Sequence, residues 1–277
     1  MKKFATLLKN VSMFFLSCLT ASSVMAQPTA KEWNAGIVGW NLGNQFECSA
    51  PGQDGESMAI GNPDGSIKAE TAWGKPEAEN LAVQNSYNQT FIDVVRATGG
   101  NNAKRHLIVQ TYVCNPDFGL DGGLIVPTDA EGNGNDYMSV EFHYYTPWDY
   151  AGECKYNFWG EPYKDKGEAS PSDEKTMADF LDKVVATWGS QGLGLVMGEW
   201  GVTDRQKAGQ TDLIHENMTY YCRFLIRETL KRGISTFVWD NNSFGSGSEH
   251  FGIFARDKGM KLQADWTLKG IMEGKEK

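Results

Sequence analysis

The stretch Leu193-Gly194-Leu195-Val196-Met197-Gly198-Glu199-Trp200-Gly201 decides the fold of this chain, because it is an apolar run that ends in a carboxylate. A short apolar run bounded by glycines is typical of a buried strand. Burying an ionised carboxylate costs several kcal/mol unless the group has partners or a role. Glu199 is therefore the first candidate for a functional residue.

Strand and helix patterns alternate around this stretch. Strands are predicted at 106–112, 138–145 and 234–239, and an earlier strand, Gly39-Trp40-Asn41-Leu42-Gly43-Asn44, runs into a polar turn. Repeated strand and helix units imply parallel strands with helices outside them. Together with the Glu199 strand there are five, whereas a closed barrel needs eight. The predicted fold class is α/β, of the (β/α)8 TIM-barrel type but incomplete, with about five of the eight parallel strands.

Helices are predicted where apolar residues recur at helical spacing. One begins with Ser170 as N-cap and Pro171 in its first turn. The next ends at Lys231-Arg232-Gly233 and carries an inner stripe of six residues. This stripe consists of Ile214, Met218, Tyr221, Cys222, Leu225 and Thr229. Two further helices are marked by Leu81, Tyr87, Phe91, Val94 and Val95 and by the segment 266–272.

The first 26 residues have the pattern of a secretory signal peptide. Lysines precede an apolar core, and Val24-Met25-Ala26 is a small-residue cleavage pattern. Serines and threonine interrupt the core, which argues against a membrane anchor of about 20 apolar residues. We expect residues 1–26 to be removed, residues 27–277 to form one domain, and the product to be secreted, extracellular or periplasmic, without membrane attachment.

The net charge narrows the range of partners. The full chain carries −9, and removing residues 1–26 takes away three lysines and no acidic residue, which leaves −12. Nucleic acid and anionic membranes are therefore not expected partners. A neutral polysaccharide remains compatible with this charge, and the oligomeric state stays open.

The cysteines leave several arrangements open. Cys48, Cys114, Cys154 and Cys222 allow two disulfides with three pairings, although the helical setting of Cys222 favours a buried free thiol. The sequence has no CxxC or HExxH spacing, so it predicts no metal site and no cofactor. It also has no nucleophile elbow around a serine or cysteine, which argues against an esterase.

Polar and aromatic residues gather where four of the predicted strands end. These residues are Asn41 and Asn44, His143 and Tyr145, Glu199, and Trp239-Asp240-Asn241. In a parallel barrel such ends meet at the face where catalytic groups lie. Taken singly, His143 is more typical of a structural histidine than of a site residue, and Trp239 is more typical of a core residue than of a sugar platform.

This set of groups suits the cleavage of a glycosidic bond. Hydrolysis with retention needs one carboxylate as nucleophile and a second, ~5 Å away, to protonate the leaving oxygen. Glu199 suits the nucleophile, Tyr145 is placed to orient it, and His143 to line the cleft. Trp239 and Trp148 offer flat apolar faces for a sugar ring.

At these residues the chain resembles glycoside hydrolase family 5, the cellulase family with a (β/α)8 barrel. The matching stretches are Gly39-Trp40-Asn41-Leu42-Gly43-Asn44, His143-Tyr144-Tyr145, Gly198-Glu199-Trp200-Gly201 and Val238-Trp239-Asp240-Asn241. The resemblance implies endo-acting hydrolysis of β-1,4-glucan (cellulose, mixed-linkage glucan or xyloglucan) with retention. It also implies that Glu199 is the nucleophile, that His143 and Tyr145 are active-site residues, and that Trp239 is the platform for the sugar. Asn44 and Trp148 are further predicted substrate-binding residues.

One part of the family pattern is missing. The acid/base residue of the family is the glutamate of an Asn-Glu motif on the fourth strand, and this sequence has no Asn-Glu pair. The resemblance implies an internal deletion near 73–77 that removes the second to fourth β/α units. Absence of a positioned acid forfeits roughly 10² to 10⁴ in rate. Asp240, Glu141 and Glu47 are candidate substitutes that the sequence does not distinguish.

Two alternatives to an active hydrolase follow from this gap. One is a noncatalytic β-glucan-binding protein that uses Trp239, Trp148 and Trp200 as sugar-facing aromatics. The other is an inactive fragment. Five strands also leave two sheet edges, which favours association or poor stability.

Overall fold

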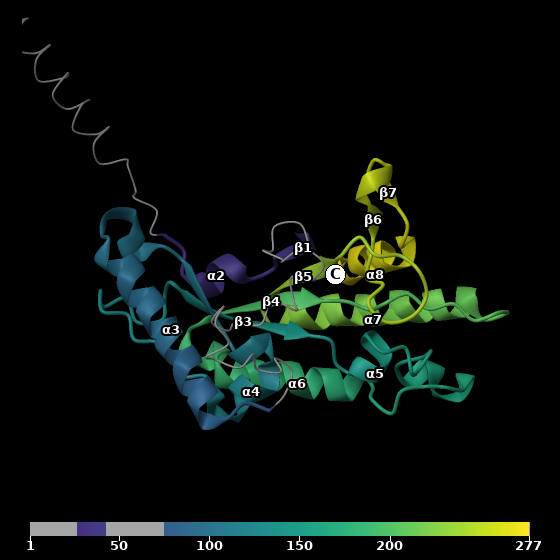
Figure 1. Cartoon of the computed structure of the whole chain (residues 1–277), viewed down its shortest axis with the longest axis horizontal. Coiled ribbons are helices and arrows are strands. Elements are labelled where there is room, and N and C mark those ends of the chain that lie inside the picture. The colour runs from purple at the N-terminus through teal and green to yellow at the C-terminus, as the bar shows by residue number, and fades with distance from the viewer. Residues whose placement is uncertain (1–26, 43–74, 277) are drawn as a thin grey trace, which may run out of the picture.

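The computed structural model describes residues 27–42 and 75–276 (Figure 1). Its α-helices and strands, in chain order, are α2 (Ala30–Asn34), β1 (Val38–Leu42), α3 (Ala78–Ala97), β2 (Leu107–Gln110), α4 (Pro116–Phe118), β3 (Met138–Tyr144), α5 (Trp148–Ala151), α6 (Glu174–Thr187), β4 (Gly194–Trp200), α7 (Thr211–Lys231), β5 (Ile234–Asp240), β6 (Phe254–Ala255), β7 (Lys261–Leu262) and α8 (Asp265–Lys275). The signal peptide at 1–26, the segment 73–74 of the deletion site, and Asn44, Glu47 and Cys48 lie outside the described residues. Within the described ranges, no helix combines the length and the apolar character that a membrane span requires.

Five strands form one parallel sheet in the order β1–β5–β4–β3–β2. The first strand therefore pairs with the last, and the strands β2 to β5 lie in chain order beside it. Adjacent first and last strands are the arrangement of a (β/α)8 barrel, so the sheet is an arc of such a barrel. The predicted α/β fold with five parallel strands is confirmed for the described part of the chain. Within that part, β1 and β2 are the two edges.

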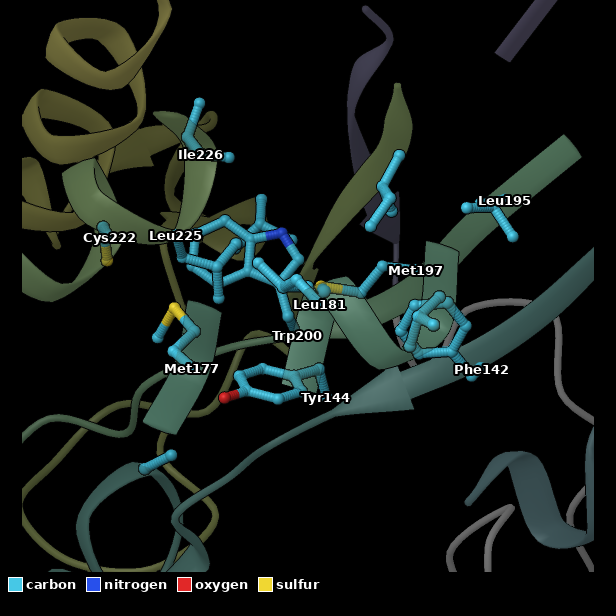
Figure 2. Packing of buried hydrophobic residues seen from close by; sticks show 14 of the residues in the cluster. Phe142, Tyr144, Met177, Leu181, Leu195, Met197, Trp200, Cys222, Leu225 and Ile226 are labelled. Carbon is cyan, nitrogen blue, oxygen red and sulfur yellow. The ribbon is translucent and has the colours of Figure 1, made fainter. Parts of the chain in front are cut away.

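Helices α6 and α7 cover one face of this sheet (Figure 1). Outward-facing residues of β3 and β4, among them Phe142, Met197 and Trp200, pack against these helices (Figure 2). All six residues of the predicted inner stripe of α7 are fully buried, which confirms that prediction. Each large apolar side chain so buried contributes about 1.5–3 kcal/mol. This layer holds the sheet and thereby the strand ends that carry the candidate site.

Helix α6 begins later than its sequence predicts. Asp173, not Ser170, is the N-cap, and its carboxylate accepts a hydrogen bond from the backbone N–H of Thr176 at 3.1 Å. The Ser170 hydroxyl instead accepts from the N–H of Ser172 at 3.2 Å and forms a local turn. A carboxylate is favoured at a helix N-terminus by the helix dipole, which explains why Asp173 takes this position.

Helix α3 is present as predicted, but most of the apolar residues that marked it do not form its buried face. Tyr87, Phe91 and Val94 are 63%, 43% and 60% exposed. The buried residues of this helix are Asn88, Ile92 and Arg96. The two polar ones are buried because they have partners; Asn88, for example, donates to the carbonyl of Gln110 at 3.0 Å.

Arg96 forms a buried ion pair with Asp129, whose partner atoms lie 2.7 Å apart. Burial raises the pKa of Asp129, but hydrogen bonds from Arg96, Asn133 and the N–H of Glu131 outweigh it, so the pKa lies below its usual value. Removing one partner of a buried pair costs about 3–5 kcal/mol because the other charge stays buried. The pair joins α3 to the loop that leads into β3.

We expect Asp129→Asn to lower the free energy of unfolding by about 3–5 kcal/mol at neutral pH. The lowered pKa of Asp129 stabilises the fold above the unfolded-state pKa, and this contribution is lost as the pH falls through the folded-state pKa. The difference between parent and variant should therefore shrink below about pH 4. Urea unfolding at several pH values measures this difference in the free energy of unfolding.

Asp179→Asn, which removes an exposed partner of Lys175, is the control, and its free energy of unfolding should change little. A parent–variant difference that does not depend on pH would contradict this account.

Candidate active site

A bulge in β4 turns Glu199 towards the site. Along β3 and β4, Phe142 pairs with Met197, but His143 pairs with Glu199, so Gly198 is an extra residue on β4. Side chains of a strand alternate between the two faces, and an extra residue reverses this alternation. Without Gly198 as the extra residue, Glu199 would point to the face covered by α6 and α7. The bulge places it on the same face as His143.

The Glu199 carboxylate is held by two side chains from β3 and the residue that follows it. The Tyr145 hydroxyl donates to Glu199 Oε2 at 3.1 Å, and His143 Nδ1 lies 3.2 Å from the same oxygen. The Glu199 side chain is 16% exposed, so it is partly shielded yet reachable. The hydrogen bond predicted between Tyr145 and Glu199 is present. The catalytic roles of these three residues remain predictions.

Glu141 is the second carboxylate of the site. Its Oε1 lies 3.0 Å from His143 Nε2, so the imidazole ring stands between Glu141 and Glu199. Gly198 makes room for it, because a Cβ at that position would collide with the Glu141 carboxylate. Glu141 lies two residues before His143, so strand alternation places both on one face. That spacing was the signal that would have separated Glu141 from the other candidate acids.

Asp240 is occupied elsewhere in the fold. Its side chain is fully buried and accepts hydrogen bonds from the backbone N–H groups of Asn242 at 3.0 Å, Ile253 at 3.0 Å and Phe254 at 3.2 Å. These bonds tie the end of β5 to the segment around β6. The Asp240 carboxylate is therefore engaged in holding the fold together.

Cys114 lies beside Glu141 and was not identified from the sequence as a site residue. It ends the short 3₁₀ turn Tyr112–Cys114 after β2, where Val113 and Cys114 have φ of 47° and 55°. Non-glycine residues with positive φ are strained and often mark functional positions. Burial, together with the carboxylates of Glu141 and Glu199, raises the pKa of the Cys114 thiol. Its closeness to Glu141 arises only from the pairing of β2 with β3.

Three cysteines lie in the described part of the chain, and no disulfide forms between them. Cys114, Cys154 and Cys222 are free thiols. Cys222 is fully buried on α7, as its helical setting predicts. Of the pairings that the sequence left open, those that join two of these three cysteines are therefore excluded.

The three tryptophans predicted to contact sugar have different surroundings. Trp148 is 47% exposed and meets Tyr145 edge to face, with ring centroids 6.1 Å apart. Trp239 is on the same face of the sheet as Glu141 but is only 5% exposed, and it lines a small cavity with Phe251 and Trp266. Its role as a sugar platform stays a prediction. Trp200 is fully buried against α6 and α7, so its proposed use as a sugar-facing aromatic is wrong.

We expect Tyr145→Phe to slow any reaction at Glu199 by about 10- to 100-fold, because a hydrogen bond to a charged group contributes about 1.5–3 kcal/mol. The ring contacts with Trp148 and Phe251 should remain, so the fold should not change. Steady-state rates on an aryl β-cellobioside measure the effect. Tyr156→Phe, whose ring is not part of the site, is the matched control. Equal rates for Tyr145→Phe and the parent would show that the hydroxyl does not act on Glu199.

The sequence and the fold both match one family of known proteins. The family model described as Cellulase (glycosyl hydrolase family 5) matches residues 57–245, more than half of the chain. The chain is 29% identical over 215 residues to Endoglucanase A of Paenibacillus barcinonensis, covering 73% of this chain and 52% of the relative. It is 30% identical over 173 residues to a xyloglucan-specific endo-beta-1,4-glucanase of Bacteroides ovatus, covering 60% of this chain and 33% of the relative.

Solved structures show the same likeness. A family 5 xyloglucanase from Paenibacillus pabuli superposes with a TM-score of 0.67 at 26% identity, covering 75% of this chain and 59% of that one. A Bacteroidetes-affiliated cellulase linked with a polysaccharide utilization locus gives a TM-score of 0.62 at 30% identity, covering 71% and 48%. The chain spans about half the length of the curated relatives it matches, or less.

Proposed function

Since the chain belongs to glycosyl hydrolase family 5, the cellulase family, we propose that it is a retaining endo-β-1,4-glucanase with Glu199 as its nucleophile. The observation that carries the proposal is the setting of Glu199, a partly shielded carboxylate held by Tyr145 and His143 where β4 ends. Parallel barrels carry their catalytic groups at this end of the strands. The relatives named above support β-glucan, including xyloglucan, as the substrate class.

The residues suggest the following reaction. A Glu199 oxygen attacks the anomeric carbon of a glucosyl unit, the glycosidic bond breaks, and a glycosyl–enzyme ester forms that water later hydrolyses. The Tyr145 hydroxyl orients the attacking carboxylate through its 3.1 Å hydrogen bond. The half-exposed Trp148 ring offers an apolar face to a neighbouring sugar.

Protonation of the leaving oxygen is the step that we expect to be slow in this chain. We infer that the chain has lost the second to fourth β/α units, which carry the acid of the family. Two carboxylates in the described residues are candidates to replace this acid. Asp240 is hydrogen-bonded to backbone N–H groups, which leaves Glu141 as the candidate. Glu141 contacts His143 on the side away from Glu199, so we propose slow turnover of natural glucan rather than full activity.

We also propose that the chain is exported after cleavage near residue 26. The basic and apolar pattern of the first residues supports this, and a polysaccharide too large to enter a cell fits it. Mass spectrometry of the protein recovered from the medium or periplasm of an expressing cell tests it. Recovery of the uncut chain in the cytoplasm would contradict it.

Endo action is tested on soluble mixed-linkage glucan and xyloglucan by following viscosity and reducing ends together. We expect viscosity to fall well before many reducing ends appear, because internal cleavage shortens chains early. A chain that is retarded in a glucan-containing gel but produces no reducing ends would instead support the noncatalytic binder. Neither retardation nor cleavage would support the inactive fragment.

A further inference from the structure

Three side chains of different chemistry converge beside Glu199. Cys114 from the turn after β2 and Glu141 and His143 from β3 each offer one atom, and these sulfur, oxygen and nitrogen atoms all lie within 4.8 Å of one another. All three residues are partly buried. A thiol, a carboxylate and an imidazole are the ligand types that zinc prefers.

We propose that Cys114, Glu141 and His143 bind a divalent cation of the zinc class. Zinc sites that keep an open position use three protein ligands, and combinations of Cys, His and Glu are typical of them. A thiolate ligand favours zinc, cobalt or cadmium over magnesium or calcium, which prefer oxygen alone.

The distances suit a single ion. Zinc lies about 2.0–2.1 Å from nitrogen and oxygen ligands and about 2.3 Å from sulfur, so tetrahedral ligands are roughly 3.3–3.6 Å apart. His143 Nε2 and Glu141 Oε1 are already 3.0 Å apart. All three donor atoms lie within 4.8 Å of one another, and Cys114 lies in a short turn outside the sheet, so small adjustments bring the set to this spacing. A fourth donor atom is near, since Gln110 Oε1 is 3.3 Å from the Cys114 sulfur.

Glu199 completes the surroundings of this site. Histidine ligands of metals usually donate their other ring N–H to a carboxylate, which fixes the tautomer and the ring orientation. Here His143 Nδ1 faces Glu199 Oε2 at 3.2 Å. With the cation bound, this contact would hold the proton on Nδ1 while the lone pair of Nε2 binds the cation. Gly198 contributes by leaving space for the Glu141 carboxylate.

Binding would affect the reaction proposed above, and this consequence alone rests on the proposed function. The cation would bind Glu141 and His143 and place positive charge next to Glu199. We expect zinc to inhibit hydrolysis and a chelator to restore it. Cation binding itself does not depend on hydrolysis and is measured separately.

Cobalt(II) titration of the reduced, chelator-treated chain gives a direct readout. A thiolate bound to cobalt absorbs in the near ultraviolet, and we expect this band to saturate at one cobalt per chain and to be removed by zinc. Magnesium and calcium should not remove it. Cys114→Ser removes the thiolate ligand itself, so it should lose the band and about 100-fold or more in zinc affinity, at least as much as the roughly 10–100-fold that loss of an outer partner costs. Glu199→Gln should weaken binding by about 10-fold or more.

Cys154 supplies the matched control because it is also a partly exposed free thiol but lies outside the cluster. Cys154→Ser should keep the cobalt band. The parent chain provides a second test that needs no variant. Zinc should slow alkylation of Cys114 by iodoacetamide at least 10-fold, while alkylation of Cys154, followed by mass spectrometry of the peptides, should not change. Absence of the band, its persistence in Cys114→Ser, or equal alkylation of Cys114 with and without zinc would overturn the proposal.

Discussion

Glu199→Gln is expected to lower the rate on an activated aryl β-cellobioside by about 10⁴-fold or more, because an amide cannot form the glycosyl ester. The substitution keeps the size of the side chain and an acceptor oxygen for Tyr145, so the fold should survive. A β-cellobioside with a good leaving group and fluorine at C2 should also label the parent chain covalently. Peptide mass spectrometry should then place the sugar on Glu199.

The control for this experiment is Glu153→Gln, since Glu153 is an exposed carboxylate outside the site. Its rate should match that of the parent. Sugar found on any other carboxylate, or a Glu199→Gln variant that keeps its activity, would exclude Glu199 as the nucleophile. Retardation of Glu199→Gln in a glucan gel would show that binding survives without the reaction.

The second large effect concerns the leaving group. If the acid of the family is absent, cleavage of a natural glucan should be about 10²- to 10⁴-fold slower than in an intact relative such as Endoglucanase A of Paenibacillus barcinonensis. Dinitrophenyl β-cellobioside needs no proton on its leaving oxygen, so formation of the glycosyl–enzyme from this substrate, measured as kcat/KM, should differ between the two enzymes by less than about 10-fold. The comparison is made with both substrates at equal enzyme concentration.

Azide provides an independent check of the same idea. An anion of this kind attacks the glycosyl–enzyme without a general base, so it should accelerate turnover of the activated substrate and yield β-cellobiosyl azide. An intact relative gains little, because its own base activates water. Equal deficits on glucan and on the dinitrophenyl substrate, or no response to azide, would contradict a missing acid/base. In that case the Glu141→Gln variant would show whether Glu141 supplies the proton.

Much of the architecture follows from local patterns in the chain. The inner stripe of α7 and the β4 run are strongly periodic or strongly apolar, and burial of such residues leaves few other arrangements. The same patterns were less informative in α3, where Asn88 and Arg96 are buried and Tyr87 is exposed. There, hydrogen-bond partners from other parts of the chain decided which face turned inward.

The amino-acid sequence alone determined the parallel α/β fold, the order of the strands and helices, and the position of Glu199 at a strand end. It could do so because periodicity and the residues at strand ends are local properties. Only the tertiary structure decided which way Glu199 faces, since one extra residue at Gly198 reverses the alternation of a strand. It also brought Cys114 next to Glu141 and committed Asp240 to backbone N–H groups. These contacts join residues on different strands or loops, and their positions depend on register and turns that no single stretch of sequence specifies.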